Sequence, residues 1–149
     1  MKIDSILAPE RTFCNIVTRS KKNAIEKAAT LIAESMLSLD AHHVFKKLIE
    51  REKLGPTALG HGIAVPHCRI EGCDNIVGAL FTLDSAVDFA AYDDTPVNIM
   101  FVLLVPIHEV DNHLKAMAML AEKFESSKYR ENLRGASSGQ ELFERALVS

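Results

Sequence analysis

The chain has 149 residues, 48% of them hydrophobic and 25% charged, and its formal net charge at pH 7 is −3. This composition is ordinary for a globular protein, and the length predicts a single domain, residues 1–149, with one sizeable core. A small negative charge without a basic stripe gives no support to nucleic-acid binding.

No segment of the chain is expected to enter a membrane. The longest apolar run, residues 99–105, is far shorter than the ~20 residues that span a bilayer. The first residues include an acid, Asp4, and no apolar run of signal-peptide length. The three cysteines, Cys14, Cys68 and Cys73, form no paired framework, which favours a reducing compartment. We therefore expect a cytoplasmic protein.

The first predicted helix follows residues 1–19, which form an edge strand or a loose leader. Ser20 is expected to cap this helix, because a serine oxygen can accept a hydrogen bond from a free N–H group at a helix start. The apolar residues recur at helical spacing and predict one buried face, made of Ala24, Ala28, Leu31 and Ile32.

The second predicted helix begins after Asp40, another capping residue. Its buried stripe consists of Val44, Phe45, Leu48 and Ile49. Gly55, in left-handed backbone, and Pro56, which cannot continue a helix, are expected to end it. Arg51 therefore lies on the last turn.

Residues 59–68, with the sequence LGHGIAVPHC, present the second of their two histidines, His67, from a stiff backbone. Gly60 and Gly62 permit a tight turn and the close approach of a ligand, and a short extended segment follows them. Pro66 fixes its own φ and biases the preceding residue toward extended backbone. His67 is therefore a candidate nucleophile, base or ligand, although a histidine that is simply hydrogen-bonded at a strand end fits the spacing equally well.

Two strands are predicted at residues 76–83 and 97–105, which are almost continuous apolar runs. Such runs indicate burial on both faces, as in a sheet that helices cover on each side. Residues 84–96, between the two runs, are polar and turn-like. The expected fold class is α/β, with helices before and after a small sheet.

The last third of the chain is predicted to be helical. Asp111 or Asn112 is expected to cap a third helix. Its predicted apolar stripe consists of Leu114, Met117, Ala118, Ala121 and Phe124. A short helix that ends at Gly135, and a final helix opened by the capping box that begins at Ser138, are expected to follow.

Two kinds of site can be weighed against the residues around His67. A metal site is disfavoured, because His61, His67, Cys68 and Cys73 match no paired CxxC or HExxH template. A dyad of Cys68 with His67 is poorly placed, because adjacent residues of an extended chain point to opposite faces. We therefore expect no bound metal, and a packing role for Cys68.

Phosphoryl transfer through the histidine itself is the third possibility. A neutral imidazole offers a lone pair at pH 7, and a bound phosphoryl group needs cations and donors around it. Arg51 supplies a guanidinium, and His113 lies in the first turn of the third helix, where free N–H groups favour anions. Taken singly, Arg51 would be a surface cation and His113 a polar helix start. The sequence does not show whether they converge on His67.

Residues 52–68, in the pattern E-x6-L-G-x2-I-A-V-P-H-C, resemble the signature of a known family. It is that of the type-2 (mannitol/fructose/nitrogen-class) IIA components of the bacterial phosphoenolpyruvate-dependent phosphotransferase system. The resemblance covers residues 5–147 and is closest to the free-standing nitrogen-regulatory IIA proteins. Pro56, Ala58 and His61 stand where the family commonly has serine, glycine and asparagine, which bears on loop shape and partner preference.

The resemblance implies a small mixed sheet with helices on both faces, no cofactor and a phosphohistidine intermediate. His67 would accept a phosphoryl group from the phosphohistidine of a small histidine-containing phosphocarrier protein. His113 matches the family's second active-site histidine, and Arg51 matches the arginine beside the phosphoryl group.

Three functions follow from these observations. The first is a phosphotransferase-system component whose phosphorylation state regulates other proteins. The second is a sugar-specific IIA component that passes the group to a separate IIB domain. Because this chain contains no IIB domain or membrane IIC segment, the first is favoured. The third is a binding module that has lost transfer, which the presence of His67, Arg51 and His113 disfavours.

Overall fold

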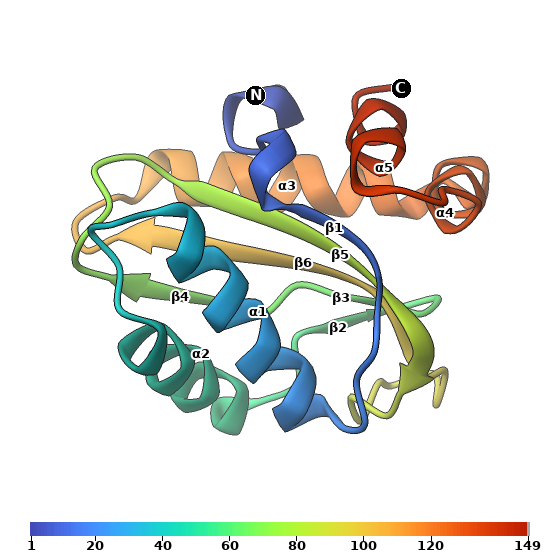
Figure 1. The fold of residues 1–149 in the computed structure, drawn as a ribbon, viewed down its shortest axis with the longest axis horizontal. Helices are drawn as coiled ribbons and strands as arrows, with labels where there is room; N and C mark the ends of the chain where they lie inside the picture. Colours follow the sequence, from blue (N-terminus) through green and yellow to red (C-terminus); the bar gives the residue numbers. More distant parts are fainter. Residues whose placement is uncertain (149) are drawn as a thin grey trace.

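The protein, described by a computed structural model over residues 1–148, is built around one mixed sheet of six strands (Figure 1). The strand order is β1-β5-β6-β3-β2, and β4 also pairs with β6. β1 and β5, β3 and β6, and β4 and β6 run parallel, whereas β5 and β6, and β2 and β3, run antiparallel. The strands are β1 Thr12–Ile16, β2 Ala58–Gly60, β3 Ile63–Ala64, β4 His67–Ile70, β5 Val77–Val87 and β6 Val97–Pro106.

Helices cover both faces of this sheet, which confirms the predicted α/β class. Helices α1 Lys21–Ser35 and α2 Ala41–Leu54 lie on one face (Figure 1). The opposite face carries α3 Asp111–Glu125, α4 Ser127–Arg134, α5 Gly139–Ala146 and the short 3-10 helices Ile3–Ser5 and Pro9–Arg11. Within residues 1–148, none of the helices combines the length and the apolar character needed to cross a membrane.

The core consists of two apolar layers, one on each side of β5 and β6. Alternate residues of these strands point to opposite faces, so each strand contributes to both layers. The layer under α1 and α2 includes Phe81, Met100, Val102 and Leu104. The layer under α3, α4 and α5 includes Leu80, Phe101, Leu103 and Val105. The prediction that the two apolar runs are buried on both faces is therefore confirmed.

Several predicted helix starts are confirmed in atomic detail. The side chain of Ser20 accepts a hydrogen bond from the backbone N–H of Asn23 (3.1 Å), and that of Asp40 accepts one from His43 (2.9 Å). Ser138 caps the last helix in the same way. Residues 1–19 contain an edge strand, β1, which agrees with the first of the two forms expected there.

The predicted cap of the third helix is wrong. Asp111 is the first helical residue, and the capping position is Val110, whose side chain makes no capping bond. The carboxylate of Glu109 instead accepts from the backbone and side-chain N–H groups of Asn112 (3.4 and 3.0 Å). An acidic group still satisfies donors at this helix start, but it comes from the preceding loop.

The predicted buried stripe of the third helix is correct only in part, because Phe124 is buried and Met117 packs, partly buried, against the core. The buried residues of α3 are Ala116, Leu120 and Phe124, whereas Leu114 is exposed. Alanine, methionine and leucine occur all around this helix, so its apolar period does not specify which row faces the sheet.

Two further predictions need correction at chain turns. Gly55 ends α2 as expected, but its φ of 160° and ψ of 149° are extended rather than left-handed. Pro56 explains this, because the residue before a proline is forced toward extended backbone. The predicted turn at residues 84–96 begins late, since β5 continues to Val87 and pairs there with Val97.

Candidate functional site

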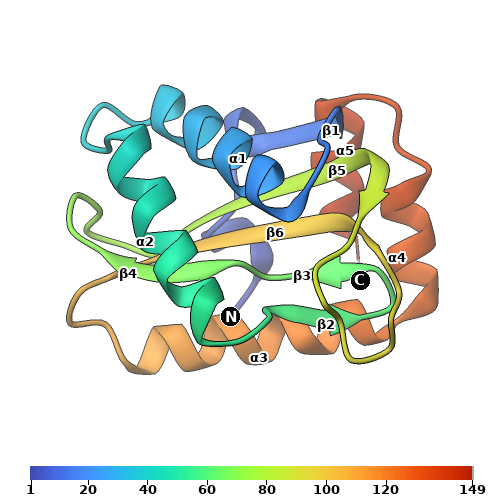
Figure 2. The same cartoon turned by 90° about the horizontal axis from the view of Figure 1, so that it is seen from below.

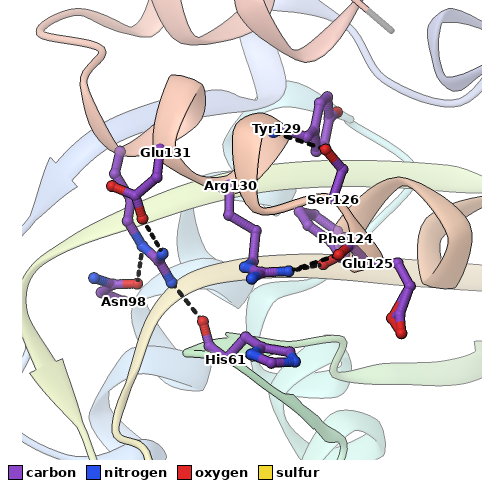
Figure 3. Close-up of polar contacts among 9 residues, drawn as sticks. His61, Asn98, Phe124, Glu125, Ser126, Tyr129, Arg130 and Glu131 are labelled. Atoms are coloured by element: carbon purple, nitrogen blue, oxygen red, sulfur yellow. Dashed lines mark hydrogen bonds and ion pairs between the residues drawn. The ribbon is translucent and has the colours of Figure 1, made fainter.

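The turn between β2 and β3 is held by side chains from two other segments. Gly60, His61 and Gly62 have φ values of 90°, 57° and 81°, so both glycines adopt backbone that disfavours larger residues. Asp93 accepts a hydrogen bond from the backbone N–H of His61 (2.8 Å). Arg134 on α4 donates to the His61 carbonyl (2.5 Å) and to the side-chain oxygen of Asn98 (3.1 Å), and Figure 3 labels these two partners. These contacts fix the turn from which the chain proceeds to His67.

His67 begins β4, which lies between α2 and α3 (Figure 2). Its Nδ1 lies 2.7 Å from the backbone carbonyl oxygen of Val65. Since a carbonyl oxygen only accepts hydrogen bonds, Nδ1 must carry the proton, and Nε2 is left with the lone pair. Burial lowers the pKa of His67, and the nearby charge of Arg51 lowers it further, which outweighs the opposing effect of the Val65 hydrogen bond. His67 is therefore a neutral imidazole whose Nε2 carries the free lone pair.

The structure brings the three residues singled out from the sequence to one depression of about 350 Å³. The rings of His67 and His113 have their centroids 5.8 Å apart with an angle of 60° between their planes. His113 is the third residue of α3, and Arg51 lies on the last turn of α2, where it donates to the Gly55 carbonyl (2.9 Å). The depression is lined by Lys47, Glu50, Arg51, Leu54, His67, Cys68, Arg69 and His113.

Arg69 is a member of this site that the sequence reasoning missed. Its Nη2 lies 3.3 Å from Nδ1 of His113. Its Nη1 donates to the carbonyls of Pro106 (3.4 Å), Ile107 (3.3 Å) and Glu109. The sequence did contain a signal for Arg69, because residues two apart on a strand point to the same face and Arg69 is two residues after His67. Finding it required knowing that a strand continues beyond His67.

Glu52 is the second residue without an assigned role in the sequence reasoning. It is buried, and its carboxylate pairs with Lys21 of α1 (2.9 Å). The same carboxylate accepts from the backbone N–H (2.9 Å) and the hydroxyl (2.6 Å) of Thr57. The carbonyl of Thr57 in turn accepts from the N–H of Val65 (3.0 Å), whose own carbonyl binds His67. Glu52 thus fixes the backbone that orients the imidazole.

Cys68 points away from His67, as expected for adjacent residues of a strand. It is buried in the layer under α1 and α2, and burial raises the pKa of its thiol to about 12. His61 is exposed on the β2–β3 turn. Over residues 1–148, no three histidine, cysteine, aspartate or glutamate side chains are grouped so as to hold a metal ion. The packing role predicted for Cys68 is confirmed.

A larger depression, of about 750 Å³, lies between the N-terminal segment and α3. Neither histidine nor arginine occurs among its lining residues, which include Lys2, Asp4, Lys115 and Glu122. It therefore offers neither an imidazole nucleophile nor a guanidinium for an anion. Of these two depressions, only the smaller one, around His67, brings histidine and arginine side chains together.

Comparison with known proteins gives one consistent result. The family model described as "Phosphoenolpyruvate-dependent sugar phosphotransferase system, EIIA 2" matches residues 5–146. The nitrogen regulatory protein of Pseudomonas aeruginosa is 39% identical over 144 residues, which cover 97% of this chain and 94% of that protein.

Solved structures agree with this match. The crystal structure of the nitrogen regulatory protein IIA-Ntr from Neisseria meningitidis has a TM-score of 0.85 and 37% identity, and the match covers 97% of this chain and 98% of that one. The Escherichia coli mannitol enzyme IIA, solved in a complex with phosphorylated enzyme IIB, is similar in fold, with a TM-score of 0.77 and 22% identity over 95% of this chain and 98% of that one.

Proposed function

Because the chain belongs to the EIIA 2 family of the phosphoenolpyruvate-dependent sugar phosphotransferase system, we propose that it accepts a phosphoryl group on Nε2 of His67. The donor is the phosphohistidine of a small histidine-containing phosphocarrier protein in the cytoplasm. The observation that carries this proposal is the bond from His67 Nδ1 to the Val65 carbonyl, which leaves Nε2 as the free nucleophile beside Arg51 and His113.

The proposed step exchanges one nitrogen–phosphorus bond for another. The lone pair of His67 Nε2 attacks the phosphorus, and the carrier's imidazole departs with the electron pair of the bond that breaks. Negative charge on the transferring oxygens is stabilised by the Arg51 guanidinium and by an N–H of His113. A neutral His67 is required at the start, which agrees with its lowered pKa.

A regulatory role is the form of this function that we favour. Its support is the similarity to relatives named nitrogen regulatory protein, at 39% and 35% identity over 97% of this chain. The competing role, passage of the group to a separate IIB domain during sugar uptake, rests on likeness of fold. Deleting the protein from its host should leave the uptake of individual sugars intact, whereas loss of uptake of one sugar would support the competing role.

The direct test of acceptance is reconstitution. The protein is incubated with phosphoenolpyruvate, the first enzyme of the system and the phosphocarrier protein, and its mass is then measured before and after acid treatment. We expect one phosphate that is lost in acid, as phosphohistidine is. A protein that gains no phosphate in a mixture where the carrier is phosphorylated would contradict the proposal.

The pH dependence follows from the lowered pKa of His67. Burial and Arg51 both favour the neutral ring, so the proton is taken up only below the ordinary value of ~6.5. An NMR titration of the His67 ring should show its midpoint below that value, and a midpoint at or above it would be contrary to the account. For the same reason the free energy of unfolding should fall as the pH drops through ~6.5, because the unfolded chain binds the proton that the folded ring resists.

Replacing Arg51 with alanine should slow phosphoryl acceptance by about tenfold or more. The estimate corresponds to the loss of a charge-assisted hydrogen bond to the phosphoryl oxygens. Single-turnover transfer from the phosphorylated carrier measures the effect, and the lifetime of the phosphoprotein should shorten as well. Lys53→Ala is the matched control, since it removes an exposed cation from the same helix turn. Equal slowing in both variants would contradict a direct contact of Arg51 with the phosphoryl group, because any nearby positive charge would then have the same effect.

A further inference from the structure

Arg69 connects the strand of His67 with the helix of His113. Through Nη1 it donates to three carbonyls, that of Pro106 at the end of β6 and those of Ile107 and Glu109 in the loop before α3. Through Nη2 it approaches Nδ1 of His113 at 3.3 Å. The guanidinium is planar, so the contacts to the carbonyls also fix the direction from which Nη2 meets the ring.

The chemistry of this contact determines where the proton of His113 lies. An arginine side chain has five N–H donors and no acceptor, and it stays protonated at any pH of interest. Nδ1 of His113 can therefore meet Nη2 only as an acceptor, and the proton of the neutral ring must lie on Nε2. In His67 the partner of Nδ1 is the carbonyl of Val65, which is only an acceptor and imposes the reverse arrangement.

We propose that Arg69 is a positioning residue that keeps Nδ1 of His113 unprotonated, so that His113 offers its Nε2–H to the phosphoryl group on His67. Two neighbouring imidazoles are thereby given opposite roles by the atoms that meet their Nδ1 nitrogens. His67 keeps the lone pair on Nε2 and acts as the nucleophile, whereas His113 keeps the proton on Nε2 and acts as the donor. This inference rests on the proposed function, which supplies the phosphoryl group.

The surroundings of His113 support this arrangement. Partial burial lowers the pKa of His113, and the neighbouring His67 and Arg69 lower it further. The ring is therefore neutral at pH 7, and a neutral ring has only one N–H to place. A second proton on Nδ1 would face the guanidinium of Arg69 directly, which both hydrogen bonding and charge repulsion oppose.

The first experiment observes the ring nitrogens of the unphosphorylated protein at pH 7 by long-range proton–nitrogen NMR. In the wild type we expect His113 with an unprotonated Nδ1, and His67 with a protonated Nδ1. In Arg69→Met the Nδ1 signal of His113 should move toward the protonated position, while that of His67 stays in place. Lys47→Met is the matched control, because it removes another cation from the same depression and should leave Nδ1 of His113 unprotonated. A protonated Nδ1 in the wild type, or no change in Arg69→Met, would overturn the inference.

The second experiment is a double-mutant cycle on single-turnover transfer. Arg69→Met should slow transfer by about tenfold in the wild type but by less than about twofold when His113 is already alanine, because Arg69 acts through that ring. Equal slowing in both backgrounds would mean that Arg69 acts independently, and would overturn the inference. If Arg69→Met does not fold, Arg69→Lys serves instead, since one ammonium cannot reproduce the planar contacts.

The two proposals can fail separately. The NMR measurement needs no phosphoryl donor, so it decides the state of His113 even if the protein accepts no phosphate. Conversely, normal phosphorylation of His67 together with a protonated Nδ1 on His113 would leave the proposed function standing and remove the role of Arg69.

Discussion

Replacing His67 with alanine is expected to abolish phosphoryl acceptance, a loss of at least about a thousandfold, because it removes the nucleophile itself. The fold should persist, since the side chain is half-buried and contributes one hydrogen bond, to the Val65 carbonyl. Mass spectrometry after reconstitution with the phosphorylated carrier measures the loss, and circular dichroism checks the fold.

The matched control for this variant is His61→Asn. His61 is an exposed histidine six residues earlier, and its φ of 57° is one that asparagine adopts with little strain. This variant should accept phosphate as the wild type does. Acceptance that survives in His67→Ala would refute the assignment of the nucleophile.

The second large effect is expected on stability, in Glu52→Ala. The variant leaves Lys21 without its partner, and it leaves the buried N–H and hydroxyl of Thr57 without a hydrogen-bond acceptor. Breaking a buried pair costs 3–5 kcal/mol, but the Lys21 side chain is 27% exposed and water recovers part of its interaction. We expect the free energy of unfolding to fall by about 3 kcal/mol, measured as a shift of the urea midpoint.

Two comparisons make this stability prediction specific. Glu50→Ala removes a more exposed carboxylate from the same helix, which pairs with Lys47 at 4.0 Å, and should lower the free energy of unfolding by less than about 0.5 kcal/mol. Glu52→Gln keeps an acceptor for Thr57, and its loss of unfolding free energy should lie between those of Glu50→Ala and Glu52→Ala. A loss below about 1 kcal/mol in Glu52→Ala would show that the buried carboxylate does not hold the His67 backbone in the way described.

Sequence patterns predicted the framework of the fold well. The runs that became β5 and β6 are long and apolar, and only a sheet covered on both faces buries such runs. The capping serine and aspartate before α1 and α2 act locally, so their hydrogen bonds could be anticipated without a partner. Strands β2, β3 and β4 have only two to four residues and depend on pairing with other strands, β3 and β4 with β6, and β2 with β3. Sequence patterns alone predicted only an extended segment there.

The third helix shows where periodicity stops being informative. Its apolar residues spread around most of the helix, so their spacing alone does not determine which row faces the sheet. Leu114 was expected in the core and is exposed instead. The same helix nevertheless carries His113 in its first turn, as predicted, because that placement depended only on where the helix begins.

Around His67, too, local sequence explains some features, whereas others depend on tertiary contacts. The glycines and the proline explain from local physics why this histidine is held by its backbone, but the spacing left nucleophile, base and ligand open. Arg69 contacts His113 of α3, and Glu52 contacts Lys21 of α1. Contacts between residues so far apart in the sequence cannot be derived from local pattern. The bond to the Val65 carbonyl, which selects Nε2, is likewise a matter of geometry.

The nitrogen that carries the phosphoryl group is the most direct test of the central proposal. The protein labelled with ¹⁵N in its histidines is phosphorylated through the carrier, and phosphorus–nitrogen coupling is read by NMR. We predict coupling to Nε2 of His67, with Nδ1 of the same ring still protonated against the Val65 carbonyl. Coupling to Nδ1 of His67, or to a nitrogen of any other histidine, would contradict the account.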